Sequence, residues 1–345
     1  MAILTNVCER LFLDHVFGVT EWNRPTNLYL GVSATAFTEA DTAFAALQKE
    51  AGSSSTSVFN ANSYARVKIA QSGSSGNTKM VQHPATQSSG ASSFKNTLGA
   101  GQIDFPQASG SGWGAIQYWA IFQSDIPANS TSESAINADA NQAPLMFGSF
   151  SSATTVASGS QFRISEGDFE IIPPSNIVEN VFNAEAYWAG LLGLTYDYDW
   201  AFKTASTGDH QRWWLGISTT EYAWNETQGG HQEPGYSSTS SQLNNGYIQR
   251  AEVIMGAAST STNNTTSSNT SAIVFPECQT NNWGDIAYWA LYQGGSSGSG
   301  QNPKTAGTNN AQNQPIFKGA LSTAKTVTVG DVLRFPIGSF VIGAT

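Results

Sequence analysis

The sequence predicts two tandem copies of one mainly β domain, each an antiparallel β-sandwich or barrel that opens with a single α-helix. The main observation is a repeated stretch: residues 113–123 and 283–293 lie 170 positions apart and are identical at seven of eleven positions. Upstream, residues 103–106 and 273–276 keep the same offset of 170. Self-similarity at a constant offset is the signature of a duplicated module.

The composition fits folded β domains with polar loops. Of the 345 residues, 40% are hydrophobic and 10 are Trp, while only 12% are charged, about half the roughly 25% of ordinary globular proteins. A disordered chain would lack this aromatic content, and the length is sufficient for two separate cores.

Charge, cysteine content and hydropathy exclude several classes of protein. The net charge is −10 and no Lys/Arg cluster is present, so we expect no nucleic-acid partner, which would require a basic face. Cys8 and Cys278 occupy non-equivalent positions of the two copies, so neither a disulfide nor a zinc site is expected. No apolar run approaches the ~20 residues that span a bilayer, and no signal peptide is predicted, so we expect no membrane partner.

Each predicted domain begins with an amphipathic helix. In residues 4–17, apolar side chains recur at steps of three and four, Thr5 or Asn6 is a suitable N-cap, and Gly18 ends the pattern. Residues 175–192 have the same pattern in the second copy and are followed by Gly193.

The strands follow in the same order in both copies. An apolar strand is predicted at 27–33 and at 212–218, followed by a polar loop and a short strand within 64–69 and 247–254. Stretches rich in Ser, Thr, Asn and Gly, at 71–101 and 257–271, are predicted to be extended surface loops.

The repeated Trp-Gly strand and a final pair of strands complete each domain. Gly114 and Gly284, directly after the first Trp of each repeat, predict a bend or bulge. Near the end of the second copy, alternating residues on either side of Gly330-Asp331 predict a β-hairpin. Pro173-Pro174 separates the copies, so we predict domains at 1–173 and 174–345, each with about six or seven strands.

Two groups of aromatic residues receive different interpretations. Positions that recur in both copies at strand spacing favour core packing over a sugar-stacking platform, and these are Trp113, Trp119, Trp283 and Trp289. Aromatic residues in or near loops peculiar to the second copy, beside carboxylates, are typical of contact with a protein or a glycan. These candidate contact residues are Tyr196, Tyr198, Trp200, Tyr222 and Trp224.

The sequence offers no catalytic, cofactor-binding or metal-binding motif. It contains no Gly-x-Ser-x-Gly elbow, phosphate loop or His-Glu-x-x-His run. Glu226, His231 and Glu233 lie close in sequence, but their spacing matches no ligand pattern. We therefore expect no catalytic residue, no cofactor and no metal. A depolymerase stays an alternative, because paired carboxylates for glycosidic cleavage require only spatial proximity.

The motifs resemble those of a phage virion family, the tail fibre proteins of phage genomes. In that pattern a Leu-Asp-His helix precedes a strand, and a Trp-Gly strand precedes a Gly-Ala-Leu segment and a Gly-Asp turn. The residues that carry the resemblance are Leu13-Asp14-His15, Trp283-Gly284, Trp289-Ala290-Leu291, Gly319-Ala320-Leu321, Lys325, Val327 and Gly330-Asp331. The second helix departs from the pattern, with Tyr187-Trp188 in place of Asp-His.

The resemblance implies a non-enzymatic structural protein on the exterior of a tailed bacteriophage particle, as a tail fibre, tail appendage or adaptor. Its partners would be other virion proteins of capsid or tail, with assembly in the host cytoplasm. A capsid decoration (cement) protein is the first alternative, and a carbohydrate-binding module for a host surface glycan is the second. A homo-oligomer is expected, with a trimer favoured, because three chains would present six similar domains to a six-fold platform.

Overall fold

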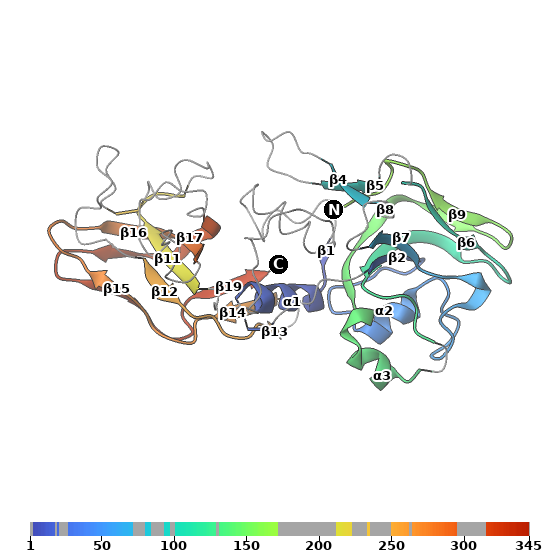
Figure 1. Ribbon diagram of the computed structural model, residues 1–345, viewed down its shortest axis with the longest axis horizontal. Coiled ribbons are helices and arrows are strands. Elements are labelled where there is room, and N and C mark those ends of the chain that lie inside the picture. Colours follow the sequence, from blue (N-terminus) through green and yellow to red (C-terminus); the bar gives the residue numbers. More distant parts are fainter. Residues whose placement is uncertain are drawn as a thin grey trace.

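The computed structural model contains two β-rich halves with one helix between them (Figure 1). It describes residues 3–17, 19–20, 27–71, 80–83, 93–96, 101–128, 131–171, 212–222, 233–234, 250–261, 264–294 and 315–344. The two halves correspond to the two copies of the repeat. The mainly β fold with two tandem antiparallel units is thus confirmed, whereas the boundary near residue 173 stays a prediction.

The first copy is built on a five-stranded antiparallel sheet with the order β1-β8-β7-β2-β3. A pair, β6-β9, and a three-stranded sheet, β10-β5-β4, accompany it. The strands are β1 (Ile3–Leu4), β2 (Asn27–Ser33), β3 (Val67–Gln71), β4 (Met80–His83), β5 (Ser93–Asn96), β6 (Ile103–Gln107), β7 (Gly114–Phe122), β8 (Pro144–Val156), β9 (Gln161–Ile164) and β10 (Glu170–Ile171).

The second copy repeats these sheets. Its main sheet has the order β12-β11-β16-β17, and β15-β18 and β13-β14-β19 are the smaller sheets. The strands are β11 (Arg212–Ser218), β12 (Ala251–Val253), β13 (Ser259–Ser261), β14 (Asn264–Ser268), β15 (Ile273–Glu277), β16 (Gly284–Gly294), β17 (Pro315–Val327), β18 (Val332–Phe335) and β19 (Val341–Ala344). Equivalent residues are paired: Leu30 faces Ile121 in the first copy, and Leu215 faces Leu291 in the second.

The bend predicted after the first Trp of each repeat is present. Gly114 and Gly284 begin their strands with φ values of +77° and +85°, a left-handed conformation that glycine adopts without steric cost. Irregularities in register follow in both copies, between Ile116 and Tyr118 and between Ile286 and Tyr288.

Three α-helices lie in the described part of the chain. The predicted first helix is confirmed as α1 (Asn6–Val16), and Thr5 Oγ1 caps it by accepting from the Cys8 N–H at 3.2 Å. Two short helices were not predicted: α2 (Ala43–Lys49), capped by Thr42, and α3 (Glu133–Ala138), capped by Ser132. Short 3-10 turns occupy Ala61–Ser63 and Ala140–Gln142. The predicted helix at 175–192 lies outside the described residues.

The two Ser/Thr-rich stretches contain strands, so the prediction of extended loops was wrong for the part that is described. Strands β13 and β14 occupy most of 257–271, and β4 and β5 lie within 71–101. Threonine is a good strand former because its branched side chain suits a pleated surface. In β14, Thr265 and Ser267 are buried, so this polar strand contributes to the interior.

The Gly330-Asp331 turn has the predicted position but a different role. The turn has φ +92° at Gly330, and Asp331 accepts hydrogen bonds from the N–H and hydroxyl of Thr328. In the described residues β17 pairs with β16, whereas β18 pairs with β15. The predicted hairpin was therefore wrong, because the turn leads the chain from one sheet to the other. Sequence alternation is the same for both arrangements.

Candidate functional site

The aromatic residues predicted to make external contacts are only partly described. Tyr196, Tyr198, Trp200 and Trp224 lie outside the described residues. Tyr222 is 1% exposed and packs in a buried cluster with Trp214, Ala290 and Tyr292. Its side chain is therefore inside the second copy, in contrast to the exposed position expected from the sequence.

The four repeated tryptophans lie at equivalent positions of the two cores. Trp113, Trp119 and Trp283 are buried, and Trp289 is half-buried. The Trp119 ring lies 5.1 Å from that of Phe169, and the Trp289 ring lies 5.0 Å from that of Phe340, both edge-on. Phe169 and Phe340 directly precede the last strand of each copy, so these contacts hold that part of the chain against the main sheet.

A buried ion pair occurs in both copies, and sequence reasoning missed it. In the first copy, the Arg66 guanidinium binds the Glu50 carboxylate at 2.6 Å, and both side chains are fully buried. In the second copy, Arg250 binds Glu233 at 2.8 Å, with both side chains buried. The guanidinium carbons lie 3.6 Å from the Phe122 ring centroid and 3.3 Å from the Tyr292 ring centroid.

The surroundings of the two pairs are equivalent as well. A Cβ added at Gly31 would lie 2.7 Å from Glu50, and one added at Gly216 would lie 2.2 Å from Glu233, so glycine makes room for the carboxylate. The offsets between the copies are 183 for the two Glu and 184 for the two Arg. The recurrence of a Glu and an Arg at nearly the same offset in the two copies is the sequence signal that would have revealed the pairs.

The chemistry of these clusters is structural. In the first copy, Glu50 also accepts from the Tyr64 hydroxyl at 2.9 Å, and Arg66 also donates to the Ser124 carbonyl and to Gln142. Burial, and then the charge of Glu50, hold the pKa of Tyr64 well above its usual value. Such a saturated pair offers no free base or nucleophile. The described residues contain no group of His, Cys, Asp and Glu that could hold a metal ion, and no helix long and apolar enough to cross a membrane.

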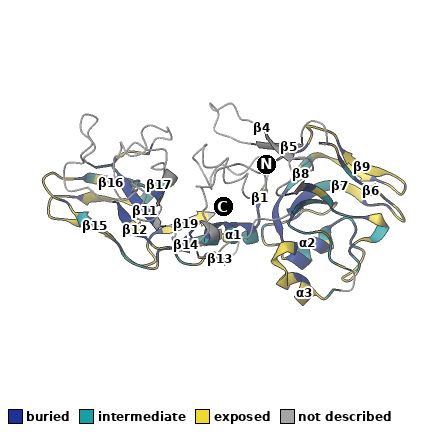
Figure 2. Cartoon of the chain, viewed as in Figure 1, coloured by how far each residue is buried: buried dark blue, intermediate teal, exposed yellow. Residues whose placement is uncertain are grey.

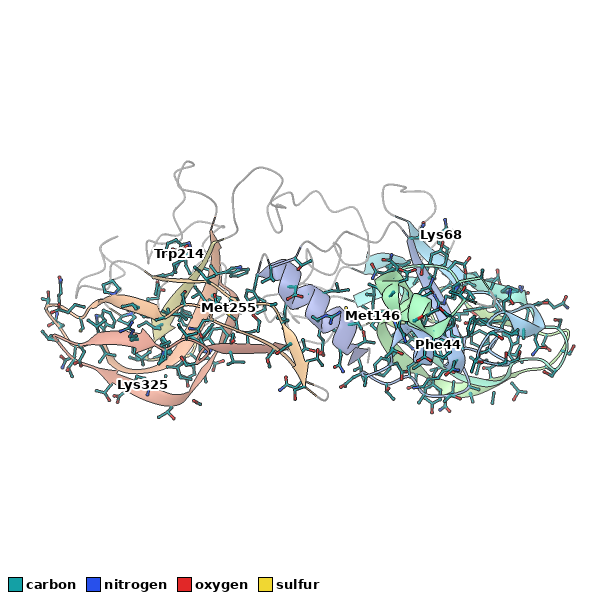
Figure 3. The ribbon with its side chains drawn as sticks, turned by 90° about the horizontal axis from the view of Figure 1, so that it is seen from below. Phe44, Lys68, Met146, Trp214, Met255 and Lys325 are labelled. Atoms are coloured by element: carbon teal, nitrogen blue, oxygen red, sulfur yellow. The ribbon has the colours of Figure 1, made fainter. Side chains whose placement is uncertain are left out.

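Helix α1 joins the two copies. At its start, β1 pairs with β8, and Thr5 Oγ1 donates to the Pro144 carbonyl. Further along, Phe12 lies 6.3 Å from Phe317, and Phe17 lies 5.5 Å from Trp213. Figures 1 and 3 show the helix between the two halves in perpendicular views. The start of the helix is therefore attached to the first copy, and its far end packs against aromatic residues of the second.

Polar contacts complete this junction. Asp14 Oδ1 accepts from the Ala258 N–H at 2.7 Å, which joins the helix to the segment before β13. Glu9 is only 2% exposed and is hydrogen-bonded to Thr265 of β14. Burial is the main cause that raises the pKa of Glu9 to about 7; the hydrogen bond from Thr265 opposes the shift, and the charge of Glu39 adds to it.

Most of the large exposed apolar side chains in the described part of the chain belong to the second copy. Figure 2 shows buried residues on the central strands and on α1, and exposed residues toward the outer ends of both halves. Among the described residues, eight large apolar side chains are exposed, and six of them lie in the second copy: Ile254, Val274, Val329, Val332, Ile337 and Val341. Scattered exposed apolar residues are ordinary, whereas a group of them marks an interaction surface.

Comparison with models of known protein families shows which family the chain belongs to. The model of the family described as podophage GP4 fiber I protein gp80 matches residues 3–172 and 198–343. The chain belongs to this family. The match falls on the two copies separately, in agreement with the tandem repeat and with the virion family that the motifs resemble. No curated protein matches the chain.

Proposed function

We propose that the protein is a non-enzymatic structural component of a podophage particle, located on the exterior of the virion as a tail fibre, tail appendage or adaptor. The observation that carries this proposal is the family match over both copies.

The same proposal covers partners and assembly. Other virion proteins are the expected partners, with assembly in the host cytoplasm and a trimer of this chain on a six-fold platform. Native mass spectrometry of the purified chain tests the trimer: a stable monomer without affinity for particles would contradict it.

Copy number distinguishes a tail position from the alternative, capsid decoration. Quantitative mass spectrometry of purified particles, calibrated on the major capsid protein, is the measurement. A few to a few dozen chains per particle would support a tail or vertex component, and hundreds would support capsid decoration. Absence from purified particles would reject both.

A carbohydrate-binding role is the second alternative, and it rests on the aromatic and acidic residues at 196–200. Trp200→Ala and Trp224→Ala should reduce host adsorption if these residues contact a glycan. A matched control is Trp289→Phe, which changes a core aromatic residue. Unchanged adsorption in both contact variants would reject the glycan role. A depolymerase would release reducing sugars from host polysaccharide, and we expect no release.

A further inference from the structure

The outer face of one strand pair has opposite character in the two copies. In the first copy, Asp104 of β6 is opposite Arg163 of β9, and the two form an ion pair at 2.6 Å. In the second copy, the equivalent residues are Val274 of β15 and Arg334 of β18, which are also opposite each other. The carboxylate that neutralises the arginine in one copy is thus replaced by an apolar side chain in the other.

The same change extends to residues that follow the strand pair in the chain. The positions held by Gln161, Glu166 and Glu170 in the first copy are held by Val332, Ile337 and Val341 in the second, at an offset of 171. All of these side chains are exposed. The second copy therefore presents an apolar face where the first presents a polar one, although the underlying strands are the same.

Four residues define the centre of this face, which we call the apolar face: Val274, Glu277, Val332 and Arg334. Arg334 is opposite Val274 and Glu277 is opposite Val332, so the four lie at the corners of a square with the charges on one diagonal. All four are exposed. Within the described part of the chain, Arg334 forms no ion pair. An arginine that has a valine and no carboxylate opposite it is covered favourably only when the covering surface supplies an anionic group.

The square is complementary to itself. If a second square is laid on it and related by a two-fold axis along the diagonal through the two valines, each valine meets its own copy. Each Arg334 then meets the Glu277 of the other chain. In a two-fold contact, residue i meets j and j meets i, as this pattern requires. Because this axis runs diagonally to the strands, the strands of one chain cross those of the other at a large angle, as in the orthogonal packing of sheets.

We propose that the apolar face binds the same face of a second copy of this chain, with Arg334 of each chain paired with Glu277 of the other. Ile337 lies just after the end of β18, and Val341 begins β19 in another sheet; both are exposed. A standard interface has about 20–30 residues on each side, and this face has fewer. The contact is accordingly weak and depends on concentration unless other contacts hold the chains together. The proposal is independent of the position of the protein on the virion.

Sedimentation equilibrium of the full chain over a wide concentration range tests the contact. The reference is Val274→Asp/Val332→Gln, which gives the apolar face the residues of the first copy. At high concentration the wild-type chain should have twice the measured mass of this reference variant, whether the reference is a monomer or a larger assembly. Arg334→Glu or Glu277→Arg alone should weaken the association about tenfold or more, because like charges would then face each other. The double variant Glu277→Arg/Arg334→Glu should restore it.

A mixing experiment distinguishes the two-fold contact from other contacts. Arg334→Glu chains carry only acidic groups at the corners and Glu277→Arg chains only basic groups, so the two should associate with each other although neither associates with itself. The matched control makes the same changes on the first copy, as Gln107→Arg and Arg163→Glu, and should leave the mass unchanged. Equal masses of wild type and reference would overturn the proposal. Two other outcomes would also contradict the two-fold contact: wild-type association while the mixed variants stay apart, or loss of association in the first-copy control. Either would show that the apolar face binds the first copy of another chain instead.

Discussion

The two buried ion pairs show how single residues hold each copy together. Arg66 and Glu50 are fully buried, so removal of one partner leaves a charge without compensation. We expect Arg66→Met to lower the free energy of unfolding by about 3–5 kcal/mol. Arg163→Met, which removes the half-exposed ion pair with Asp104, should cost at most about 1 kcal/mol. Urea unfolding of both variants is the measurement, and equal losses would contradict the assignment.

Glu9 gives the junction a dependence on pH. Its pKa is about 7 in the folded chain against an ordinary value of 4.5. The folded state therefore binds the proton more tightly than the unfolded state. The contribution of Glu9 to the free energy of unfolding is fully present below pH 4.5 and is lost as the pH rises through about 7. At about 1.4 kcal/mol for each pKa unit, the loss is about 3–4 kcal/mol.

Glu9→Gln should remove this dependence, because the amide keeps the shape of the protonated carboxyl without ionising. The free energy of unfolding is measured for both chains at pH 5 and at pH 8. We expect the variant to gain stability relative to the wild type at the higher pH. Parallel pH profiles of the two chains would show that Glu9 does not titrate in this range.

At the level of the element, α1 has a larger role than an N-terminal helix usually has. Phe17 lies against Trp213 and Phe317 of the second copy. Phe17→Ala should cost about 3–5 kcal/mol, as for other buried Phe residues. Hydrogen exchange should then quicken in β11 and β17, the strands that Phe17 covers. Arg10→Ala, an exposed position on the same helix, is the control. Exchange that quickens only in the first copy would contradict a shared helix.

The sequence predicts elements better than it predicts their partners. The helix α1 and the paired central strands were predictable because apolar periodicity and the repeat indicate them directly. The contact of Phe12 with Phe317 was not predictable, because periodicity shows which face of a helix is buried but not which residues cover that face. The turn at Gly330 was found in sequence, yet its alternation does not say whether β18 pairs with β17 or with β15. The Arg66–Glu50 pair joins residues 16 positions apart across a loop, so no local pattern marks it.

At the level of the whole molecule, the two copies should depend on each other. A fragment of residues 174–345 lacks α1, and with it the contacts that Phe12 and Phe17 make with Trp213 and Phe317. We expect this fragment to be less stable alone than within the chain, and to bind a separately expressed fragment of residues 1–173. Co-purification through a tag on one fragment is the measurement. A first fragment with Phe12→Ala and Phe17→Ala should bind less, and a second fragment that is fully stable alone would reject the dependence.

The position of α1 also bears on how the molecule carries mechanical load. The helix is fixed to β8 of the first copy by the β1 strand and Thr5, and to the second copy by two aromatic rings. A force that pulls the halves apart must withdraw those rings from a packed core. Resistance to such a pull would come from side-chain packing, so an appendage built from this chain would be stiff at small extensions and would yield abruptly when the helix is released.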